Sequence, residues 1–236
     1  MCFTVSIYAQ THEIETDLGA VFDEPGAYHP YFHVSGFNHP ILPFVTNERP
    51  DVIDHLQWGL IPHWVKNVDD AAEIADKTLN ARSDTMFEKP SFRDAAKGRR
   101  GLLPVSGFVE WRHEDSVKQP YLITHRDATL FTLGCLWSTW TNKDTGEMHR
   151  SFSIITTDAN KLLSYVHNSK LRMPVVIEPE ERQQWLSTTE RSEVERLVRP
   201  LQDGLLQARP ITRSMSRIKV NDDHAELLEA IGETLT

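Results

Sequence analysis

The sequence predicts an α+β fold in which helices surround a mainly antiparallel β-sheet. Segments rich in β-branched and aromatic residues concentrate in the middle third of the 236-residue chain, and helical patterns concentrate after residue 158. The chain contains no internal repeat and no linker-like tract. We therefore expect a single domain over residues 2–236. Periodicity alone does not decide whether the sheet curls into a barrel.

The expected strands are short apolar runs separated by turn-like segments at 125–128 and 141–147. They are residues 102–111 (LLPVSGFVEW), 120–125 (PYLITH), 129–137 (TLFTLGCLW), 151–157 (SFSIITT) and 173–177 (MPVVI). The first run is apolar enough to be an interior strand, which places Glu110 near its end.

Four helices are expected in the last third of the chain. They are residues 158–167 with Asp158 as N-cap, 178–187 with Pro179 in the first turn, 192–201, and a C-terminal helix at 221–231 capped by Asn221. Helices on both sides of the last strand complete the α+β pattern.

The bulk properties exclude several classes of protein. A net charge of −9 argues against a general nucleic-acid binder, although residues 82–126 carry nine Lys and Arg against six acids. That local excess is more economically explained as solvated surface than as a basic binding face. No run approaches the roughly 20 apolar residues of a membrane span, and no secretory signal is visible, so the expected compartment is the cytoplasm.

The two cysteines, Cys2 and Cys135, are far apart in sequence and do not suggest a disulfide framework. Cys135 lies in an apolar run and is predicted to be a core thiol. The histidines lack the close spacing of metal ligands, and there is no CxxC motif. We expect no metal and no cofactor.

Cys2 is the most informative residue, because removal of Met1 would make it the N-terminus. Its thiol and α-amine would then sit on adjacent carbons, with ordinary pKa values of about 8.5 and about 7.7–8.0. Both groups are partly nucleophilic near neutral pH. Such an aminothiol condenses with an aldehyde to an imine, which the thiol closes to a thiazolidine.

Two further segments carry candidate polar groups. Glu110 is flanked by bulky residues in FVEW (108–111), and desolvation there would raise its pKa toward values useful in proton transfer. In NARSDT (80–85), the Asn80 amide and the Arg82 guanidinium are spaced to bind a sugar and a phosphate. A solvated strand end and an ordinary Asn turn are the structural alternatives.

Another pair of segments offers a proton donor and aromatic surface. His167 closes a predicted helix and Arg172 opens a predicted strand, a setting that suits a general acid or base. Trp58 and Trp64 bracket a Gly- and Pro-containing loop, WGLIPHW, that suits either base stacking or packing.

In order along the chain, these segments resemble the SRAP family (SOS response-associated peptidases), sensors that crosslink to abasic sites in DNA. The resemblance runs from residue 2 to about residue 221. It rests on an ordered set of segments: Cys2, WGLIPHW, NARSDT, GFVEW, TTDAN, HN…RMPVVI and RPITRSMSRIKVN. The family fold implies one SRAP-type domain with a barrel-like curved sheet.

The resemblance implies a role for each candidate. Cys2 is the nucleophile that forms the thiazolidine with the ring-opened aldehyde. Glu110 holds the amine and shuttles protons, and His167 donates a proton for opening of the sugar ring. Asn80 positions the sugar. The implied DNA contacts are Arg82 and Arg172 on phosphates, with Trp58 and Trp111 stacking or wedging beside the lesion.

The implied partner is single-stranded DNA that contains abasic sites, bound by a monomer that is nucleoid-associated when on DNA. Associated lyase activity is implied at the imine stage, together with autopeptidase processing that exposes the cysteine. Two alternatives remain open. One is an N-terminal-nucleophile cysteine amidohydrolase, whose glycine-rich segments are not found here, and the other is a non-covalent single-strand-binding module.

The chain departs from the family pattern at two places. Many members begin Met-Cys-Gly-Arg, whereas this chain has Phe3 and Thr4, so a cation that would contact phosphate is missing. Three residues also separate Asn168 from Arg172 where many members have none. Lys170 is therefore a candidate to share the role of Arg172.

Overall fold

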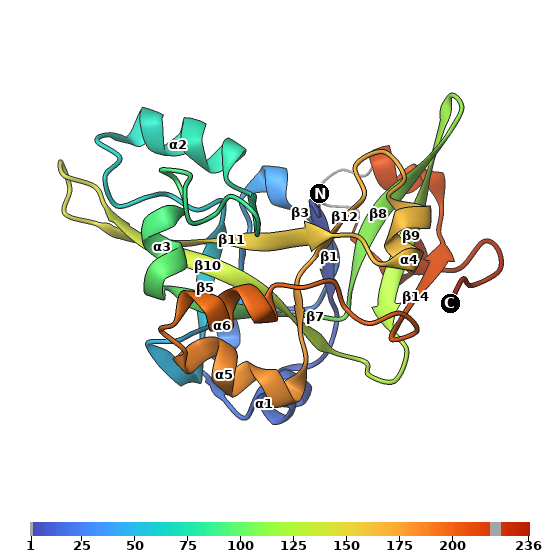
Figure 1. The fold of residues 1–236 in the computed structure, drawn as a ribbon, viewed down its shortest axis with the longest axis horizontal. Coiled ribbons are helices and arrows are strands. Elements are labelled where there is room, and N and C mark those ends of the chain that lie inside the picture. Colours follow the sequence, from blue (N-terminus) through green and yellow to red (C-terminus); the bar gives the residue numbers. More distant parts are fainter. Residues whose placement is uncertain (1, 218–222) are drawn as a thin grey trace.

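The computed structural model describes residues 2–217 and 223–236, which form two β-sheets with helices around them (Figure 1). The strands are β1 (Thr4–Ile7), β2 (Val21–Phe22), β3 (Tyr31–Ser35), β4 (Ile41–Thr46), β5 (Arg49–Trp58), β6 (Asn80–Arg82), β7 (Arg100–Val105), β8 (Gly107–Glu114), β9 (Val117–His125), β10 (Phe131–Thr141), β11 (Met148–Asp158), β12 (Arg172–Pro174), β13 (Val176–Ile177) and β14 (Leu206–Pro210).

The larger sheet closes on itself. Its main path is β12-β11-β10-β7-β4-β5-β2, and an additional parallel pairing of β5 with β11 joins Trp58 to Phe152. Strands β4, β5, β11, β10 and β7 therefore form a closed ring. All pairs in this ring except β5–β11 are antiparallel, which confirms the predicted mainly antiparallel, barrel-like α+β fold.

The barrel interior is packed so tightly that some positions accept only one residue type. The rings of Phe44 and Phe152 lie 4.8 Å apart between centroids. Gly101 on β7 faces Phe44 so closely that an added Cβ would lie 2.1 Å from the ring and 2.6 Å from the Val45 carbonyl. Only glycine fits there, because interiors at this density have no room for a further methyl group.

The smaller sheet has the order β14-β9-β8-β1-β3. The single strand predicted for residues 102–111 is in fact two strands, with β7 in the barrel and β8 in the smaller sheet. Ser106 lies between the two strands. Its backbone N–H donates to the carbonyl of Ser6 on β1, and its hydroxyl oxygen accepts from the N–H of Tyr8, the residue after β1. Glu110 consequently lies in the middle of β8 and not at a strand end.

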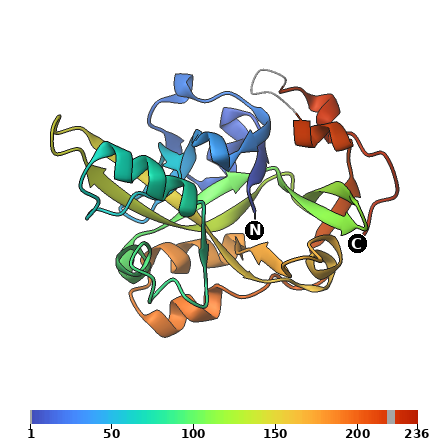
Figure 2. The same cartoon turned by 90° about the horizontal axis from the view of Figure 1, so that it is seen from above.

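The helices cover the barrel and the outer face of the smaller sheet. They are α1 (Thr11–Leu18), α2 (Val68–Lys77), α3 (Arg93–Gly98), α4 (Lys161–Val166), α5 (Arg182–Ser187) and α6 (Arg191–Leu197), with 3₁₀ turns η1 (Pro25–Ala27), η2 (Gly36–Asn38), η3 (Pro179–Glu181), η4 (Arg213–Arg217) and η5 (Ala225–Leu228). In Figure 1, α1, α5 and α6 lie below the barrel and α4 lies by the smaller sheet, and Figure 2 shows the same ribbon from above. No described helix is long and apolar enough to cross a membrane.

The helix predicted at 158–167 exists but begins later. Its N-cap is Asn160, whose side chain accepts from the N–H of Leu163 at 2.9 Å. Asp158 does not cap the helix, because it is the last residue of β11 and pairs there with Arg172 on β12. The helices predicted at 178–187 and 192–201 are present as η3 with α5 and as α6.

The predicted C-terminal helix is wrong for the described part of residues 221–231. Only the short turn η5 forms there, and its Leu227 and Leu228 pack in a small apolar cluster with Val109 and Leu122. The chain then runs along β14, where the N–H of Ile231 donates to Pro210. Asn221 lies outside the described residues.

Candidate active site

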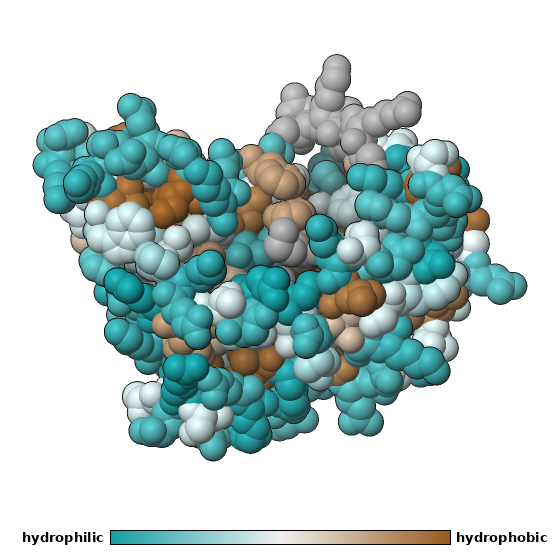
Figure 3. All heavy atoms as spheres, turned by 45° about the horizontal axis from the view of Figure 1, so that its top comes forward, coloured by the Kyte–Doolittle hydropathy of each residue, from teal (hydrophilic) through white to brown (hydrophobic). Residues whose placement is uncertain are grey.

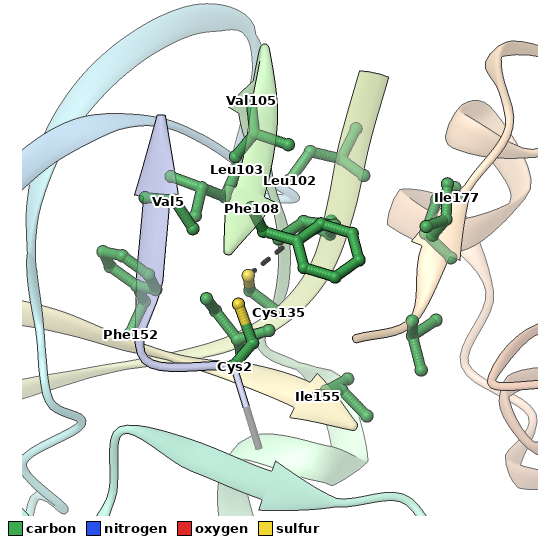
Figure 4. Packing of buried hydrophobic residues seen from close by; sticks show 14 of the residues in the cluster. Cys2, Val5, Leu102, Leu103, Val105, Phe108, Cys135, Phe152, Ile155 and Ile177 are labelled. Carbon is green, nitrogen blue, oxygen red and sulfur yellow. Dashed lines mark hydrogen bonds between the residues drawn. The ribbon is translucent and has the colours of Figure 1, made fainter. Parts of the chain in front are cut away.

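Cys2 lies in the interior where the barrel meets the smaller sheet. Its side chain is fully buried among Val5, Phe108 and Ile155, with Cys135 in the same cluster (Figure 4). The thiol donates weakly to the Thr4 carbonyl, with Sγ and O 3.7 Å apart. Burial raises the pKa of the Cys2 thiol, and the charge of Glu110 raises it further. The thiol is therefore neutral at physiological pH.

Asn80 lies next to Cys2 through pairing of β6 with β11. Its Nδ2 donates to the carbonyl of Cys2 at 2.9 Å, while β6 runs parallel to β11 with Asn80 opposite Ile154. The contact holds the backbone of residue 2 in place. Sequence reasoning brought Asn80 to the site as a sugar contact, and the structure adds this direct bond to the nucleophile's own backbone.

Glu110 reaches the same region from β8. Strand β1 pairs with β8 so that Val5 lies opposite Phe108, which brings the start of the chain beside Glu110. The carboxyl is only 2% exposed, and burial raises its pKa to about 8. Glu110 thus holds a proton through most of the neutral range, as the aromatic flanks in the sequence indicated.

His167 is the C-cap of α4 and faces Glu110. Its Nδ1 lies 2.8 Å from the Arg172 carbonyl, and its Nε2 lies 3.8 Å from Glu110 Oε2. Burial lowers the pKa of His167, so the ring is neutral. A carbonyl only accepts hydrogen bonds, so Nδ1 carries the ring proton and Nε2 presents a lone pair toward Glu110.

Glu110 and His167 line a cavity of about 1250 Å³, whereas Cys2 and Asn80 are not among its lining residues. Its walls include β1, β3, η2 and β8, and its lining contains both Glu110 and His167. Trp111, Lys118 and Lys170 also line it. The arrangement can pass a proton between a carboxyl and an imidazole at the edge of a space large enough for several groups of a ligand.

Arg82 and Arg172, both expected to contact DNA phosphates, differ in their exposure to solvent. The Arg82 side chain is 55% exposed and forms a bidentate pair with Asp84, in which Nε lies 3.0 Å from Oδ1. Arg172 is buried, and its guanidinium donates to Asp158 Oδ1 at 2.9 Å and to the Thr156 carbonyl at 2.6 Å. The geometry does not support a phosphate contact for Arg172, whereas its carbonyl orients His167.

The expectation that Trp58 stacks on bases is wrong. The ring is fully buried, its N–H donates to the Leu79 carbonyl at 2.8 Å, and it packs beside Phe152. Stacking requires an accessible ring face, and Trp58 has none. Trp111 is half-buried and lines the cavity, so its ring is placed where a ligand would lie.

Phe3 and Phe37 were missed as site residues. Both line the cavity beside Cys2, and their ring centroids are 4.9 Å apart. The one signal available in the sequence was the bulky residue at position 3, where the family pattern has glycine.

Among residues 2–217 and 223–236, no group of three or more His, Cys, Asp or Glu is placed to hold a metal ion.

Known proteins resemble this chain over most of its length. Abasic site processing protein YoqW of Bacillus subtilis (strain 168) is 30% identical over 234 residues, which cover 98% of this chain and 100% of that protein. Abasic site processing protein HMCES of Xenopus tropicalis is 32% identical over 174 residues, and the match covers 63% of this chain and 51% of that protein.

A solved structure and a family model agree with these matches. The crystal structure of a protein from Bacteroides thetaiotaomicron superposes with a TM-score of 0.91 at 36% identity, covering 97% of this chain and 99% of that one. The family model described as SOS response associated peptidase (SRAP) matches residues 1–218. With a buried Cys2 beside Glu110 and His167 in this fold, the chain belongs to the SRAP family.

Proposed function

We propose that this protein processes abasic sites in DNA by forming a covalent crosslink between Cys2 and the lesion. The observation that carries the proposal is the placement of buried Cys2 within the electrostatic reach of Glu110, which lines one cavity together with His167. The names of the relatives add support, since YoqW and HMCES are both called abasic site processing proteins. Removal of Met1 comes first, because an acylated nitrogen cannot form an imine.

The reaction begins at the α-amine of Cys2. The neutral amine adds to the aldehyde of the ring-opened abasic sugar and gives a carbinolamine. The Glu110 carboxyl, protonated below pH about 8, gives its proton to the departing hydroxyl. Water leaves, and a protonated imine and a Glu110 carboxylate remain.

The thiol then closes the ring. The Glu110 carboxylate takes the proton from the Cys2 thiol. Without such a base the thiol would stay protonated, because burial raises its pKa. The sulfur attacks the imine carbon, and the C=N electron pair moves to nitrogen, giving a neutral thiazolidine. Glu110 ends in the state in which it began, and the net change is loss of one water. Closure competes with β-elimination from the imine, the route to strand cleavage.

His167 serves the opening of the sugar ring. Its Nε2 carries a lone pair in the resting state, so it must receive a proton before it can donate one to the ring oxygen. Glu110 Oε2, 3.8 Å away, is the source. As the bond from C1′ to the ring oxygen breaks and the aldehyde forms, the C1′ hydroxyl gives its proton to the Glu110 carboxylate, so that Glu110 is protonated again before the amine adds. The carbonyl of Arg172 keeps the ring in the orientation this transfer needs.

The DNA contacts follow from availability. Arg82 binds a phosphate by exchanging Asp84 for it, and Lys170 takes the phosphate role first expected of Arg172, because Lys170 lines the cavity. Asn80 holds residue 2, and Trp111 lies where the sugar or its neighbour would pass. A single strand suits the site, because its lesion is exposed without unstacking.

The test uses protein verified by mass spectrometry to begin at Cys2. It is mixed with a single-stranded oligonucleotide bearing one abasic site and run on a denaturing gel. We expect a heat-stable shifted band that disappears with Cys2→Ala, with an intact base, and with an N-terminal extension. Cys135→Ala is the matched control, since Cys135 is an equally buried free thiol, and it should keep the band.

Other outcomes point elsewhere. Cleavage without a shifted band indicates a lyase whose imine never closes. DNA binding that Cys2→Ala leaves unchanged, with no adduct, indicates a non-covalent module. Absence of both binding and adduct removes the proposal and returns attention to amide substrates.

A further inference from the structure

Exposed Phe37 and half-buried Phe3 form an aromatic pair that lines the cavity. Phe37 on η2 is 58% exposed, and its ring lies 4.9 Å from that of Phe3 with an interplanar angle of 36°. Both side chains line the cavity that also contains Glu110 and His167. Figure 3 shows tan hydrophobic side chains in the region of η2, one of several hydrophobic patches on a largely hydrophilic face. Exposing such a ring to water is unfavourable unless something covers it.

The backbone that carries Phe37 is held from below. The N–H of Gly36 donates to the Phe3 carbonyl at 2.8 Å, which joins η2 to the residue after Cys2. The Trp58 indole packs against Gly36 so closely that an added Cβ would lie 3.0–3.1 Å from it. The backbone N–H of Trp58 also donates to the Pro40 carbonyl at 2.9 Å. Buried Trp58 thus supports the segment from beneath, and Phe37 is presented with little freedom to lose on binding.

We propose that Phe37, backed by Phe3, is the stacking surface for the nucleobase next to the abasic site. The inference rests on the proposed function and names how the intact neighbour of the lesion is held. Phe3 directly follows Cys2, and its side chain lines the same cavity as Glu110 and His167. The group nearest a reacting abasic sugar on the same strand is the adjacent base, and every base offers a π-face.

The chemistry of the rim favours a base over other occupants. Two aromatic rings provide apolar area and carry no charge, so they offer nothing to a phosphate. The two residues that directly follow Cys2 are Phe3 and Thr4, and neither carries a positive charge. Stacking therefore replaces part of the binding that a cation would provide. Because stacking grows with ring area, a purine neighbour is preferred over a pyrimidine.

The experiment measures equilibrium binding of short single strands that carry a tetrahydrofuran abasic analogue, which has no aldehyde and forms no adduct. The neighbour on the 5′ or the 3′ side is adenine, thymine or a second tetrahydrofuran. Phe37→Ala is compared with Phe37→Trp, which retains a stacking face. Met148→Ala is the matched control, since Met148 is 72% exposed at the start of β11 and does not line the cavity.

We expect wild type to bind the adenine-flanked strand at least about fivefold more tightly than the strand lacking that base, on one side of the lesion. Phe37→Ala should lose this discrimination, whereas Phe37→Trp and Met148→Ala should keep it. Discrimination that survives Phe37→Ala, or equal weakening on every strand, overturns the inference. Circular dichroism of each variant separates loss of the fold from loss of stacking.

The two proposals fail in different ways. If wild type forms no adduct with a natural abasic site, the proposed function fails, while the binding assay still reports on stacking. If the adduct forms and Phe37→Ala discriminates as wild type does, only the stacking inference fails.

Discussion

Glu110 and His167 together hold one mobile proton in the resting site. The lowered pKa of His167 and its bond to the Arg172 carbonyl leave Nε2 without a proton, and burial keeps Glu110 protonated up to pH about 8. A carboxyl in this state acts first as an acid and then as a base. That order matches the order in which imine formation and ring closure need it.

Replacing Glu110 with glutamine should slow adduct formation about a hundredfold or more, because proton transfer by a positioned side chain contributes that much. Affinity for a strand with a non-reactive abasic analogue should change little, since the amide keeps the shape of the side chain. Rapid-quench gels give the rate and fluorescence anisotropy the affinity. Glu147→Gln, at an exposed carboxylate outside the cavity, is the control. Equal rates for Glu110→Gln and wild type would remove Glu110 from the chemistry.

The same substitution predicts a pH-dependent change in stability. The pKa of Glu110 rises from 4.5 to about 8 on folding, so within this window the folded state holds a proton that the unfolded state has lost. This contribution to the free energy of unfolding falls as pH rises through the window and levels off above it. Glu110→Gln lacks it. Urea denaturation at about pH 5 and about pH 8.5 should show the variant gaining on wild type at the higher pH. A gap that does not vary with pH would contradict this.

At the residue scale, chemical type was a better guide than aromaticity. Cys2, Glu110 and His167 were identified from groups whose reactivity depends on burial and charge, and the structure brings them together. Trp58 was misassigned because a sequence does not distinguish a tryptophan that supports a loop from one that faces a ligand. Its neighbour Gly36, which leaves room for the indole, carries no such signal either.

At the scale of elements, the turn from α4 to β12 positions the imidazole. The N–H of Leu171 donates to His167, and the Leu171 carbonyl accepts from Ala159, so the turn closes on itself. Leu171 adopts a φ of 51°, in the left-handed region that a residue with a Cβ adopts at a cost. Its side chain is 53% exposed and contributes little packing. The strained backbone of Leu171 is thus part of the turn that places the Arg172 carbonyl 2.8 Å from His167 Nδ1.

Leu171→Asn should therefore raise the free energy of unfolding by about 1 kcal/mol, because asparagine tolerates the left-handed region. Leu171→Ala is the matched comparison, since it removes the exposed side chain and keeps the Cβ that causes the strain. Urea denaturation of the three proteins provides the measurement. A gain with alanine equal to that with asparagine would mean that exposure of the leucine, and not its backbone, is unfavourable.

Element boundaries were predicted least well where tertiary contacts override local patterns. Asp158 and Asn160 are both good N-caps, and pairing of Asp158 with Arg172 on β12 removes the first from competition. The sequence of residues 102–111 predicts one strand. In the structure Ser106 forms hydrogen bonds with Ser6 and Tyr8, and the chain passes from one sheet to the other at this residue. Neither event has a signature within the segment itself.

At the scale of the whole molecule, the site exists because two sheets meet. Cys2 precedes β1 of the smaller sheet, Asn80 lies on β6 against β11, and Glu110 lies on β8. The parallel pairing of β5 with β11 closes the barrel between segments nearly a hundred residues apart, and local periodicity contains no information about it. The resemblance to a family, and not the pattern of residues, supplied the curved sheet.

Charge across the whole molecule limits how DNA is bound. The chain carries a net charge of −9, and the phosphate contacts proposed above are Lys170 at the cavity and exposed Arg82, to which we add Lys118 because it also lines the cavity. With three phosphates neutralised on a single strand, log K should fall with log salt at a slope of about −2. Affinity should then drop about twentyfold between about 50 and about 200 mM salt, a shallow dependence for a DNA-binding protein.

Single lysine substitutions show whether these cations act as assigned. Lys118→Gln should lower the magnitude of the slope by about 0.7 and weaken binding to all sequences alike, because a phosphate contact does not read bases. Lys143→Gln, in the exposed turn between β10 and β11, should leave the slope unchanged. Anisotropy titrations at four salt concentrations with the non-reactive strand give the slopes. A slope that Lys118→Gln leaves intact would remove Lys118 from the phosphate contacts and would leave Lys170 and Arg82 as the cations assigned to them.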